Sequence, residues 1–440
     1  MRCKSALGVV VATLLFVGLT INSRGQDVGL APGQAPKRAG TLVRPHSSLR
    51  QPGDAGVRAH TNIELMMLAP GNPSETPPFA GLAFETPASL ACVYKLVPTT
   101  PGCVPDLTVT NPSGGSQSIA LVDAFDDPNA QSDLYNFSVQ FGIPLAPNQL
   151  QVVYAAGKAP PLDPTGGWEL EESLDIEYAH AMAPNAKIYL VEAASDSLAD
   201  LMHAVDIAAT VIQCAAPHAC AIARPGEVSM SWGFEEFPEQ LTLDARFVRR
   251  NVVFLSSSGD FPGTSWPCTS PNVVCAGGTT TARSPYDGHL LYELTWGEAG
   301  GGLSFFEPRP TFQNSLASKV GDSRGVPDLS FDSNPDTGVW ILDTNDYQGS
   351  PLPNGGWAIV GGTSVASPSL AGIINAAATL RSSFAASSQA ENTLIYSNRT
   401  LPADIHDITL GYCGPYSGFK AARLWDPCTG VGSPAGYDGK

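Results

Sequence analysis

From about residue 118 to residue 380, segments with the apolar pattern of β-strands alternate with segments that have helical periodicity. Strands are predicted at 118–123, 186–192, 227–232, 252–257 and 357–360. Helices are predicted at 168–182, 198–210, 241–249 and 364–380. Such alternation is typical of an α/β domain with a mostly parallel sheet flanked by helices. Active residues of these domains gather beyond the carboxyl ends of the strands.

The first 25 residues have the pattern of a secretory signal peptide. Arg2 and Lys4 precede an apolar run over residues 6–19, and residues 23–25 supply the small side chains of a cleavage site. A membrane anchor is the alternative, but the run is short for a bilayer span. We therefore expect a secreted protein, extracellular or periplasmic, that has no membrane contact after the signal is removed.

The remaining chain divides by composition. Residues 26–85 are rich in Pro, Gly, Ala and Arg, and are predicted to be a linker or short pro-segment without folded structure. Residues 86–440 are predicted to form one large domain.

In the whole chain, the apolar share of 43% is enough for a sizeable core, and 24 basic against 41 acidic residues give a net charge of −17. Because an acidic surface repels nucleic acid, we expect no nucleic-acid partner.

The cysteines indicate an oxidising compartment. Removal of Cys3 with the signal leaves eight of the nine cysteines, an even number. The eight lie as close neighbours in the sequence, and four local disulfides are the simplest connectivity: 92–103, 214–220, 268–275 and 413–428. The sequence alone leaves other connectivities open. A metal site built from these cysteines is disfavoured because no Cys-x-x-Cys pair occurs.

The segment Gly361-Gly362-Thr363-Ser364 is the sharpest local signal of chemistry. A predicted strand ends in a tight turn, and Ser364 opens a helix near the positive end of its dipole. An ordinary helix N-cap serine is the alternative. The Gly-x-Ser-x-Gly elbow of α/β-hydrolases is absent, because Ala366 stands where its second glycine would be.

Acidic side chains could act with such a serine. Glu171 and Asp175 are four residues apart on one predicted helix, so they share a face, where like charges favour retention of a proton. Asp260 follows an apolar strand and, when protonated, could donate a hydrogen bond to an oxyanion. A solvated acidic helix face and a turn-capping aspartate are the alternatives.

These pieces together resemble the sedolisin, or serine-carboxyl peptidase, family, whose members include kumamolisin. The resemblance runs from about Pro87 to Asp438 and rests on seven motifs in the family's order. They are Glu171-x-x-x-Asp175, Ser229-Met-Ser-Trp232-Gly233, Ser258-Gly-Asp260, Gly300-Gly-Gly-Leu-Ser304, Arg324-Gly-Val-Pro-Asp328, Gly362-Thr-Ser364 with Pro368, and His406-Asp407-Ile408 followed by residues 425–432.

The resemblance implies a subtilisin-like fold and a Ser-Glu-Asp triad that hydrolyses peptide bonds in acid. It makes Ser364 the nucleophile, Glu171 the base, Asp175 the residue that orients Glu171, and Asp260 an oxyanion donor. Trp232 and Gly233 match the strand edge that pairs with the substrate backbone. Asp123 matches a position where some members carry a supporting Glu.

The resemblance also implies one structural calcium ion near the carboxyl terminus. Asp407 and Asp426 match its two carboxylate ligands, and Ile408 matches a backbone carbonyl ligand. Two more carbonyls would come from Ala422 and Leu424, where the family prefers glycine. The family also carries a large prodomain, for which residues 26–85 leave little room.

We therefore predict a monomeric endopeptidase or tripeptidyl-peptidase that acts on peptides or proteins. A catalytically silent secreted binding protein on the same scaffold is one alternative. Another is a histidine-dependent subtilisin-like hydrolase that uses Asp123, although none of the seven histidines lies in a His-Gly-Thr-His motif. Cleavage specificity cannot be read from these residues.

Overall fold

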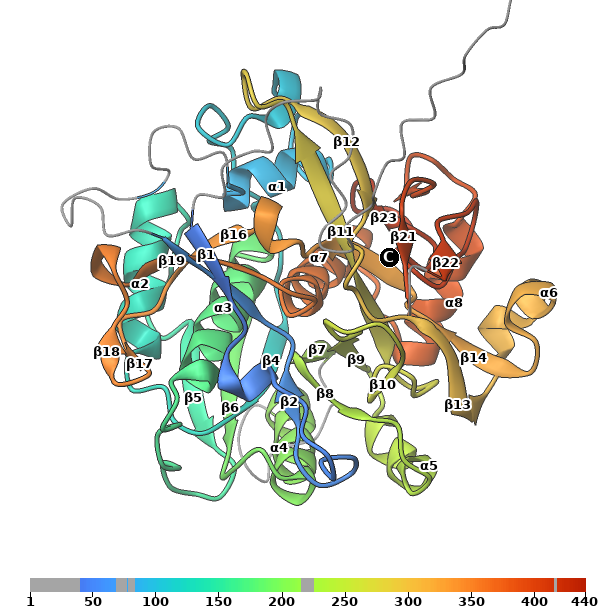
Figure 1. Cartoon of the computed structure of the whole chain (residues 1–440), viewed down its shortest axis with the longest axis horizontal. Helices are drawn as coiled ribbons and strands as arrows, with labels where there is room; N and C mark the ends of the chain where they lie inside the picture. Colours follow the sequence, from blue (N-terminus) through green and yellow to red (C-terminus); the bar gives the residue numbers. More distant parts are fainter. Residues whose placement is uncertain (1–39, 69–76, 78–83, 215–224, 415–417) are drawn as a thin grey trace, which may run out of the picture. The chain divides into compact units, whose positions relative to one another are not determined.

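The computed structural model describes residues 40–68, 77, 84–214, 225–414 and 418–440. All of them belong to one unit, residues 36–440. The largest sheet among them has eight strands, in the order β12-β11-β9-β7-β4-β6-β5, with β15 also paired to β11 (Figure 1). Its strands are β4 (Ser118–Ala124), β5 (Leu150–Tyr154), β6 (Lys187–Ala193), β7 (Gly226–Met230), β9 (Val252–Ser257), β11 (Val274–Arg283), β12 (Leu290–Thr295) and β15 (Leu329–Asp332). Every pairing in this sheet is parallel except β11–β12, so the predicted α/β class is confirmed.

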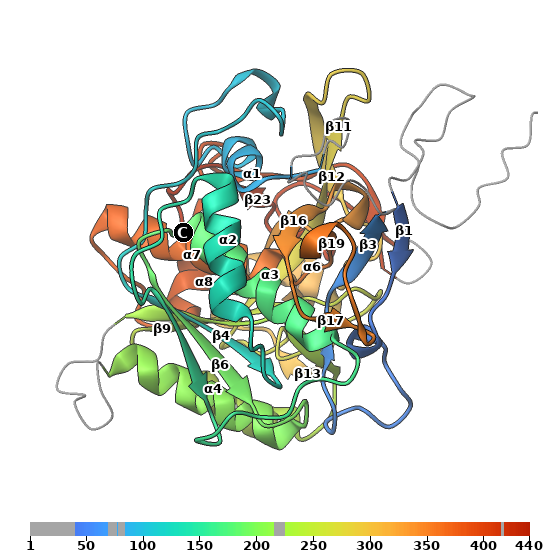
Figure 2. The same cartoon turned by 90° about the vertical axis from the view of Figure 1, so that its left-hand side faces the viewer.

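Helices cover both faces of this sheet. Alternate residues of β4 point to opposite faces: Ile119 and Leu121 join a core with α3 and α7, whereas Ala120 and Val122 join a core with α4. Figure 2 shows α4 on one side of the sheet and α2 and α3 on the other. The four helices are α2 (Ala130–Phe141), α3 (Gly167–Met182), α4 (Leu198–Gln213) and α7 (Ala366–Arg381). The predicted helices at 168–182, 198–210 and 364–380 are confirmed, with α7 starting at Ala366.

A second sheet is antiparallel and includes part of the segment that was predicted to be unfolded. Its order is β1-β3-β19-β16, formed by β1 (Gly40–Val43), β3 (Glu64–Leu68), β19 (Trp357–Gly361) and β16 (Val339–Leu342). The prediction of a strand at 357–360 is confirmed, but its assignment to the parallel sheet is wrong. The reason is that β19 pairs with β3 and β16, partners that a short apolar run does not specify.

A third, smaller sheet also uses this segment. It has the order β10-β8-β2, with β2 (His60–Thr61), β8 (Trp232–Glu235) and β10 (Ser265–Trp266). The predicted strand at 227–232 is divided at Ser231, which separates β7 from β8. Residues 40–68 are therefore folded onto the domain through β1, β2 and β3. The boundaries at residues 25 and 85 remain predictions.

One predicted helix is much shorter than expected. Over 241–249 the chain forms α5 (Gln240–Leu243) and a 3₁₀ turn (Asp244–Phe247). Phe247 packs against Phe254 and Trp266, which draws this part of the chain into the core. The remaining elements are α1 (Pro87–Val93), α6 (Ala317–Val320), α8 (Ser388–Asn398), β13 (Gly302–Pro308), β14 (Ser323–Val326), β17 (Asp346–Tyr347), β18 (Ser350–Pro351), β20 (Ile405–His406), β21 (Tyr412–Cys413), β22 (Phe419–Lys420) and β23 (Ser433–Pro434).

Three of the predicted disulfides are present. They join Cys92 to Cys103, Cys268 to Cys275, and Cys413 to Cys428. The predicted pairing 214–220 includes Cys220, which lies outside the described residues. In the part of the chain that the structure describes, no helix combines the length and apolar character needed to cross a bilayer.

Candidate active site

The helix α3 carries the two candidate carboxylates inside the protein. Every residue of α3 is buried, and Glu171 and Asp175 are both 0% exposed. The alternative of a solvated acidic helix face is therefore wrong. The helix packs against α7, and this packing brings Glu171 and Asp175 toward the turn that precedes α7.

Ser364 lies in that turn, between the end of β19 and the start of α7, and is 0% exposed. Its side chain does not cap the helix, because Val365 occupies the N-cap position. The Ser364 hydroxyl instead donates to the backbone carbonyl of Ser231 at 3.1 Å. Its backbone N–H donates to the carbonyl of Asn62 at 3.0 Å.

The carboxylates beside Ser364 are held in a protonated range by their surroundings. Burial, with the nearby Asp175 and Asp123, raises the pKa of Glu171 well above its usual value, and the adjacent Ser364 hydroxyl opposes this rise. Neither oxygen of Glu171 has a hydrogen-bond partner among the described residues. The Ser364 hydroxyl is the neighbouring group that favours the ionised form of Glu171.

Asp175 and Asp123 form the rest of this acidic group. Burial and Asp123 raise the pKa of Asp175, while Ser231, whose hydroxyl donates to Asp175 Oδ1 at 2.7 Å, opposes the rise. Asp123 is the next-to-last residue of β4, and burial raises its pKa to about 8. The hydroxyl of Ser231 fixes Asp175 and its carbonyl holds Ser364, a double role that the motif did not reveal.

Asp260 contacts Thr363, the residue that precedes Ser364. The N–H and hydroxyl of Thr363 donate to Asp260 Oδ1 at 2.7 and 2.9 Å, whereas Oδ2 has no partner among the described residues. Burial and the nearby Glu64 raise the pKa of Asp260, and the Thr363 donors oppose the rise. A proton on this carboxyl would sit on Oδ2, because Oδ1 already accepts two hydrogen bonds.

Gly362 lies against both the backbone carbonyl of Asn62 and the carboxyl group of Asp260. Its φ is +103°, and a Cβ on it would lie 2.1 Å from the Asn62 carbonyl oxygen and 2.5 Å from Asp260 Oδ2. Only glycine can occupy this position, because any side chain would collide with both oxygens. The Asn62 carbonyl and Asp260 Oδ2 therefore face the same small space beside Ser364.

The strand edge that was predicted to hold substrate is occupied by the chain's own β2. Thr61 pairs with Trp232 and His60 pairs with Gly233, both antiparallel. The Trp232 side chain is buried, and its indole N–H donates to the carbonyl of Val122 at 2.7 Å. Trp232 thus contributes its backbone to this edge and its ring to the core.

Histidine side chains do not hydrogen-bond to Ser364, Glu171 or Asp175 in the described part of the chain. Burial lowers the pKa of His60 to about 3 and that of His180 to about 4, so both are neutral over most of the acidic range. His406 interacts instead with Glu293 at 3.0 Å.

The predicted calcium ligands come together around one turn. Both oxygens of Asp407 accept from the N–H of Leu424, at 3.0 and 3.1 Å, and Asp426 accepts from the N–H of Ala422 at 3.0 Å. Ile408 is buried. Leu424 has a φ of 72°, in the left-handed region that favours glycine. Among the described residues, no group of three or more His, Cys, Asp or Glu side chains could hold a metal, so a cation here would depend on backbone oxygens.

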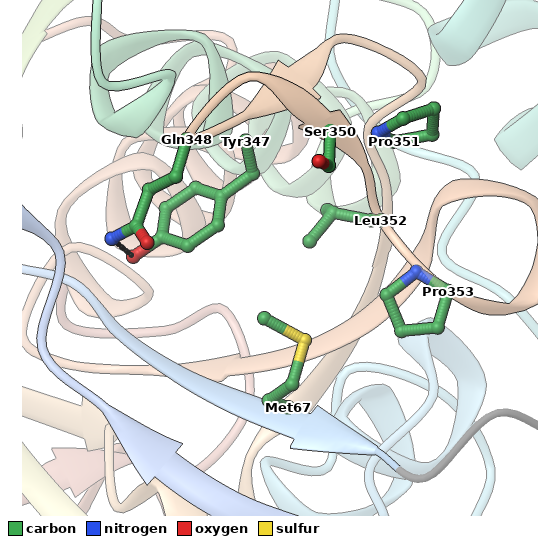
Figure 3. Close-up of a pocket in the computed structure, with 7 residues that line it drawn as sticks. All are labelled: Met67, Tyr347, Gln348, Ser350, Pro351, Leu352 and Pro353. Carbon is green, nitrogen blue, oxygen red and sulfur yellow. Dashed lines mark hydrogen bonds between the residues drawn. The ribbon is translucent and has the colours of Figure 1, made fainter.

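The domain also has a pocket that none of these residues lines. Met67 of β3 faces residues 347–353 across it, as Figure 3 shows. Gln348 donates to the hydroxyl of Tyr347 at 3.4 Å, and the other lining groups are mostly apolar. The hydroxyls of Tyr347 and Ser350 line the pocket without a carboxylate, histidine or lysine beside them among its lining residues, so we assign it no chemistry.

Comparison with known proteins agrees with this geometry. The model of the subtilase family matches residues 108–407. Kumamolisin from Bacillus sp. (strain MN-32) is 27% identical over 435 residues, which cover 90% of this chain and 67% of kumamolisin. Tripeptidyl-peptidase 1 from Dictyostelium discoideum is 29% identical over 379 residues, which cover 74% of this chain and 54% of that protein.

A solved structure shows the same fold. Pseudomonas sedolisin, a serine-carboxyl proteinase complexed with two molecules of pseudo-iodotyrostatin, superposes with a TM-score of 0.63 and 23% sequence identity. The match covers 80% of this chain and 96% of that chain. The predicted subtilisin-like fold is therefore confirmed, and the chain's relatives include sedolisin-type serine peptidases.

Proposed function

The chain belongs to the subtilase family, and on that premise we propose that it is a secreted, acid-active serine-carboxyl peptidase with a Ser364–Glu171–Asp175 triad. One observation carries the proposal. A buried pair of carboxyls, with no histidine hydrogen-bonded to it among the described residues, lies beside a serine whose backbone N–H already binds a peptide carbonyl. Subtilase chemistry requires a base, and Glu171 is the group in position to be one.

The proposed reaction proceeds through an acyl-enzyme. Ser364 Oγ attacks the carbonyl carbon of a peptide bond while Glu171 takes its proton and later gives it to the departing amine. Asp175, held by Ser231, orients Glu171. The Ser364 N–H and a protonated Asp260 Oδ2 stabilise the negative charge on the carbonyl oxygen. Water then releases the acyl group.

Acid activity follows from the protonation states that this mechanism needs. Glu171 must be ionised to accept a proton, whereas Asp260 must be protonated to donate one. Glu171 and Asp260 thus need opposite protonation states at the same time. Both states can be populated together only at pH values where carboxyl groups titrate. Burial raises the pKa of Asp260, which keeps it protonated through that range. Burial raises the pKa of Glu171 as well, with the Ser364 hydroxyl opposing the rise, so the base must be ionised from a mostly protonated group of buried carboxyls.

We also propose the finer assignments that accompany this function. Residues 86–440 carry the activity, residues 1–25 direct secretion, and residues 26–85 act as a short pro-segment.

One calcium ion would be held by the carboxylates of Asp407 and Asp426 and by the backbone carbonyls of Ile408, Ala422 and Leu424. The donor set suits a hard cation, and both carboxylates already contact the 422–424 turn. The ion would fix this terminal segment and take no part in the reaction.

Cleavage of a mixed peptide library at acid pH tests the function. The wild-type chain should cleave the library, and the cleavage sites will show whether it is an endopeptidase or removes amino-terminal tripeptides. Ser364→Ala and Glu171→Gln should each lose nearly all activity. Ser383→Ala and Glu239→Gln change the same residue types at exposed positions and should remain active. A folded wild-type chain that cleaves nothing would support a silent binding protein instead.

A further inference from the structure

A second set of buried carboxyls lies between the helix α3 and the central sheet. Asp123 of β4 and Glu192 of β6 are register partners in neighbouring parallel strands, so their side chains leave the same face of the sheet. Ile119 and Leu121 of β4 mark that face, because they alternate in step with Asp123 and belong to the core with α3 and α7. The helix α3 covers this face (Figure 2). Asp123 and Glu192 therefore point toward the helix that carries Glu171.

Glu172 extends this set from the helix side. It follows Glu171 in α3, is 0% exposed, and neither of its oxygens has a hydrogen-bond partner among the described residues. Burial raises the pKa of Glu172 well above its usual value. Four nearby carboxyls raise it further: Glu192 on β6, Asp127 after β4, Asp123 on β4 and Glu169 on α3. The Glu172 carboxyl is therefore protonated and surrounded by other carboxyls.

Asp123 links this set to the triad. It is 0% exposed, and both of its oxygens lack a hydrogen-bond partner in the part of the chain that the structure describes. Its charge, acting in addition to burial, raises the pKa of Glu171 and Asp175 and also that of Glu172. Asp123 thus lies close to carboxyls of both sets.

Glu192 leads from this set toward solvent. Burial raises the pKa of Glu192 to about 9, and the charge and a hydrogen bond of Asp126 raise it further. Asp126 is half-buried and lies beside Tyr154, which is 38% exposed. The carboxyls thus form a series from the candidate base to the surface: Glu171, Asp123, Glu172, Glu192 and Asp126.

The candidate base needs a route by which it can lose a proton. Burial favours the protonated form of Glu171 by raising its pKa, yet Glu171 must be ionised to accept the proton of Ser364. Ser364 is 0% exposed, and β2 already lies along the strand edge of the cleft. A substrate on that edge would cover the cleft in the same way. A proton that leaves Glu171 must then pass to a neighbouring acidic group.

We propose that Glu172 and Glu192 carry the proton that Glu171 must lose out to the surface. Asp123 receives it first, and Asp126 releases it to solvent. The inference rests on the proposed peptidase function. Each carboxyl along the way takes a proton on one oxygen and gives one up from the other, so Glu171 becomes ionised, one proton reaches water and the groups between are unchanged. Only O–H bonds form and break. Neither Glu172 nor Glu192 touches the reacting atoms, so both act through Glu171 as positioning residues.

Glu172→Gln tests this route in the full chain after acid incubation, with kcat and KM measured on one peptide at the acid optimum. Glutamine keeps the size and neutrality of the protonated glutamate, but its carboxamide does not exchange protons as an acid does. The variant should lose at least about tenfold in kcat with KM unchanged, whereas Glu172→Asp keeps a carboxyl and should recover most of the loss.

Glu177→Gln is the matched control. Glu177 is also 0% exposed on α3, but its carboxyl accepts from the N–H of Leu342 at 3.2 and 3.3 Å and lies outside the series. This variant should keep the wild-type kcat. A loss of kcat as large as that of Glu172→Gln would show that any buried carboxyl of α3 matters equally, and would overturn the inference.

Glu192→Gln tests the outer part of the route independently, and decides the question if Glu172→Gln does not fold. It should also lower kcat, and the solvent deuterium isotope effect on kcat should be larger than in the wild type, because proton transfer becomes rate-limiting. A wild-type kcat in either glutamine variant, or a loss of kcat that comes with a raised KM and is not recovered by Glu172→Asp, would overturn the inference and leave the peptidase function standing. If the folded wild-type chain cleaves no peptide, the proposed function itself fails.

Discussion

The backbone N–H of Ser364 donates to the carbonyl oxygen of Asn62 at 3.0 Å, which joins the turn before α7 to the amino-terminal segment. This contact depends on Gly362, whose missing side chain leaves space for that carbonyl. The geometry of the candidate nucleophile and the position of the segment are thus set by the same few atoms.

Gly362→Ala should be strongly destabilising. The new Cβ would lie 2.1 Å from the Asn62 carbonyl oxygen at a backbone φ of +103°. We expect the free energy of unfolding to fall by about 3 kcal/mol, measured by urea unfolding. Gly349→Ala is the matched control, because Gly349 also has a positive φ of +76° but no atom within 4 Å of its Cβ position. That variant should lose only about 1 kcal/mol. Equal losses would show that backbone strain alone matters at Gly362.

The protein should be most stable in acid. Burial raises the pKa of Asp123, Glu169 and Glu227 to about 8. Between pH 4 and 8 the folded state therefore keeps protons that the unfolded state has released, and the free energy of unfolding falls as the pH rises through this range. His60 and His180 act in the opposite direction, because burial favours their neutral forms, but the buried carboxyls are more numerous.

Thermal unfolding measured from pH 4 to pH 8 checks this expectation. The melting temperature should decrease steadily with rising pH. Glu227→Gln removes one buried titrating group, which accepts a hydrogen bond from Asn375, and should reduce the slope by up to about 1.4 kcal/mol per pH unit. Glu239→Gln, at an exposed position, should leave the slope unchanged. A melting temperature that rises toward neutral pH would contradict the assignment of these carboxyls as protonated.

Asp260 should control the alkaline side of the activity profile. The wild type should show a bell-shaped dependence of kcat/KM on pH with an acidic optimum, and activity should be lost as Asp260 ionises. Asp260→Asn keeps a hydrogen-bond donor at every pH and should retain activity at higher pH. Asp260→Ala should lower kcat by about 10²–10³-fold, the usual cost of one oxyanion donor. An Asn variant with the same alkaline limb as the wild type would exclude this role.

Calcium should stabilise the terminal segment without changing the chemistry. Chelation should lower the melting temperature, and added calcium should restore it, because the ion binds only the folded form. Leu424→Gly should stabilise the protein by up to about 1 kcal/mol, since Leu424 adopts the left-handed conformation at a φ of 72°. A pure protein without bound metal, whose melting curve is unaffected by chelator, would count against the site.

Much of the central sheet could be predicted because its signals are local. The strands near 118–123 and 252–257 and the helix near 168–182 have clear periodicity, and the structure places them within one or two residues of the prediction. Helix 241–249 could not be predicted correctly, because Phe247 turns into an aromatic cluster made by residues distant in sequence. The partners of β19 were missed for the same reason.

The candidate site was predicted in part. Motif order pointed to Glu171, Asp175, Asp260 and Ser364, and the structure places these four around one turn. The contacts of Ser231 with Asp175 and Ser364 were missed, because they join segments far apart in the chain.

Covalent trapping at acid pH tests the central claim most directly. The full chain, after acid incubation, is treated with a peptide aldehyde or a fluorophosphonate, and the modified residue is identified by peptide mass mapping. We predict modification of Ser364 in the wild type, no modification of that position in Ser364→Ala, and at least a hundredfold slower modification of Ser364 in Glu171→Gln. Modification of Ser364 in Glu171→Gln at the wild-type rate would contradict the assignment of Glu171 as the base.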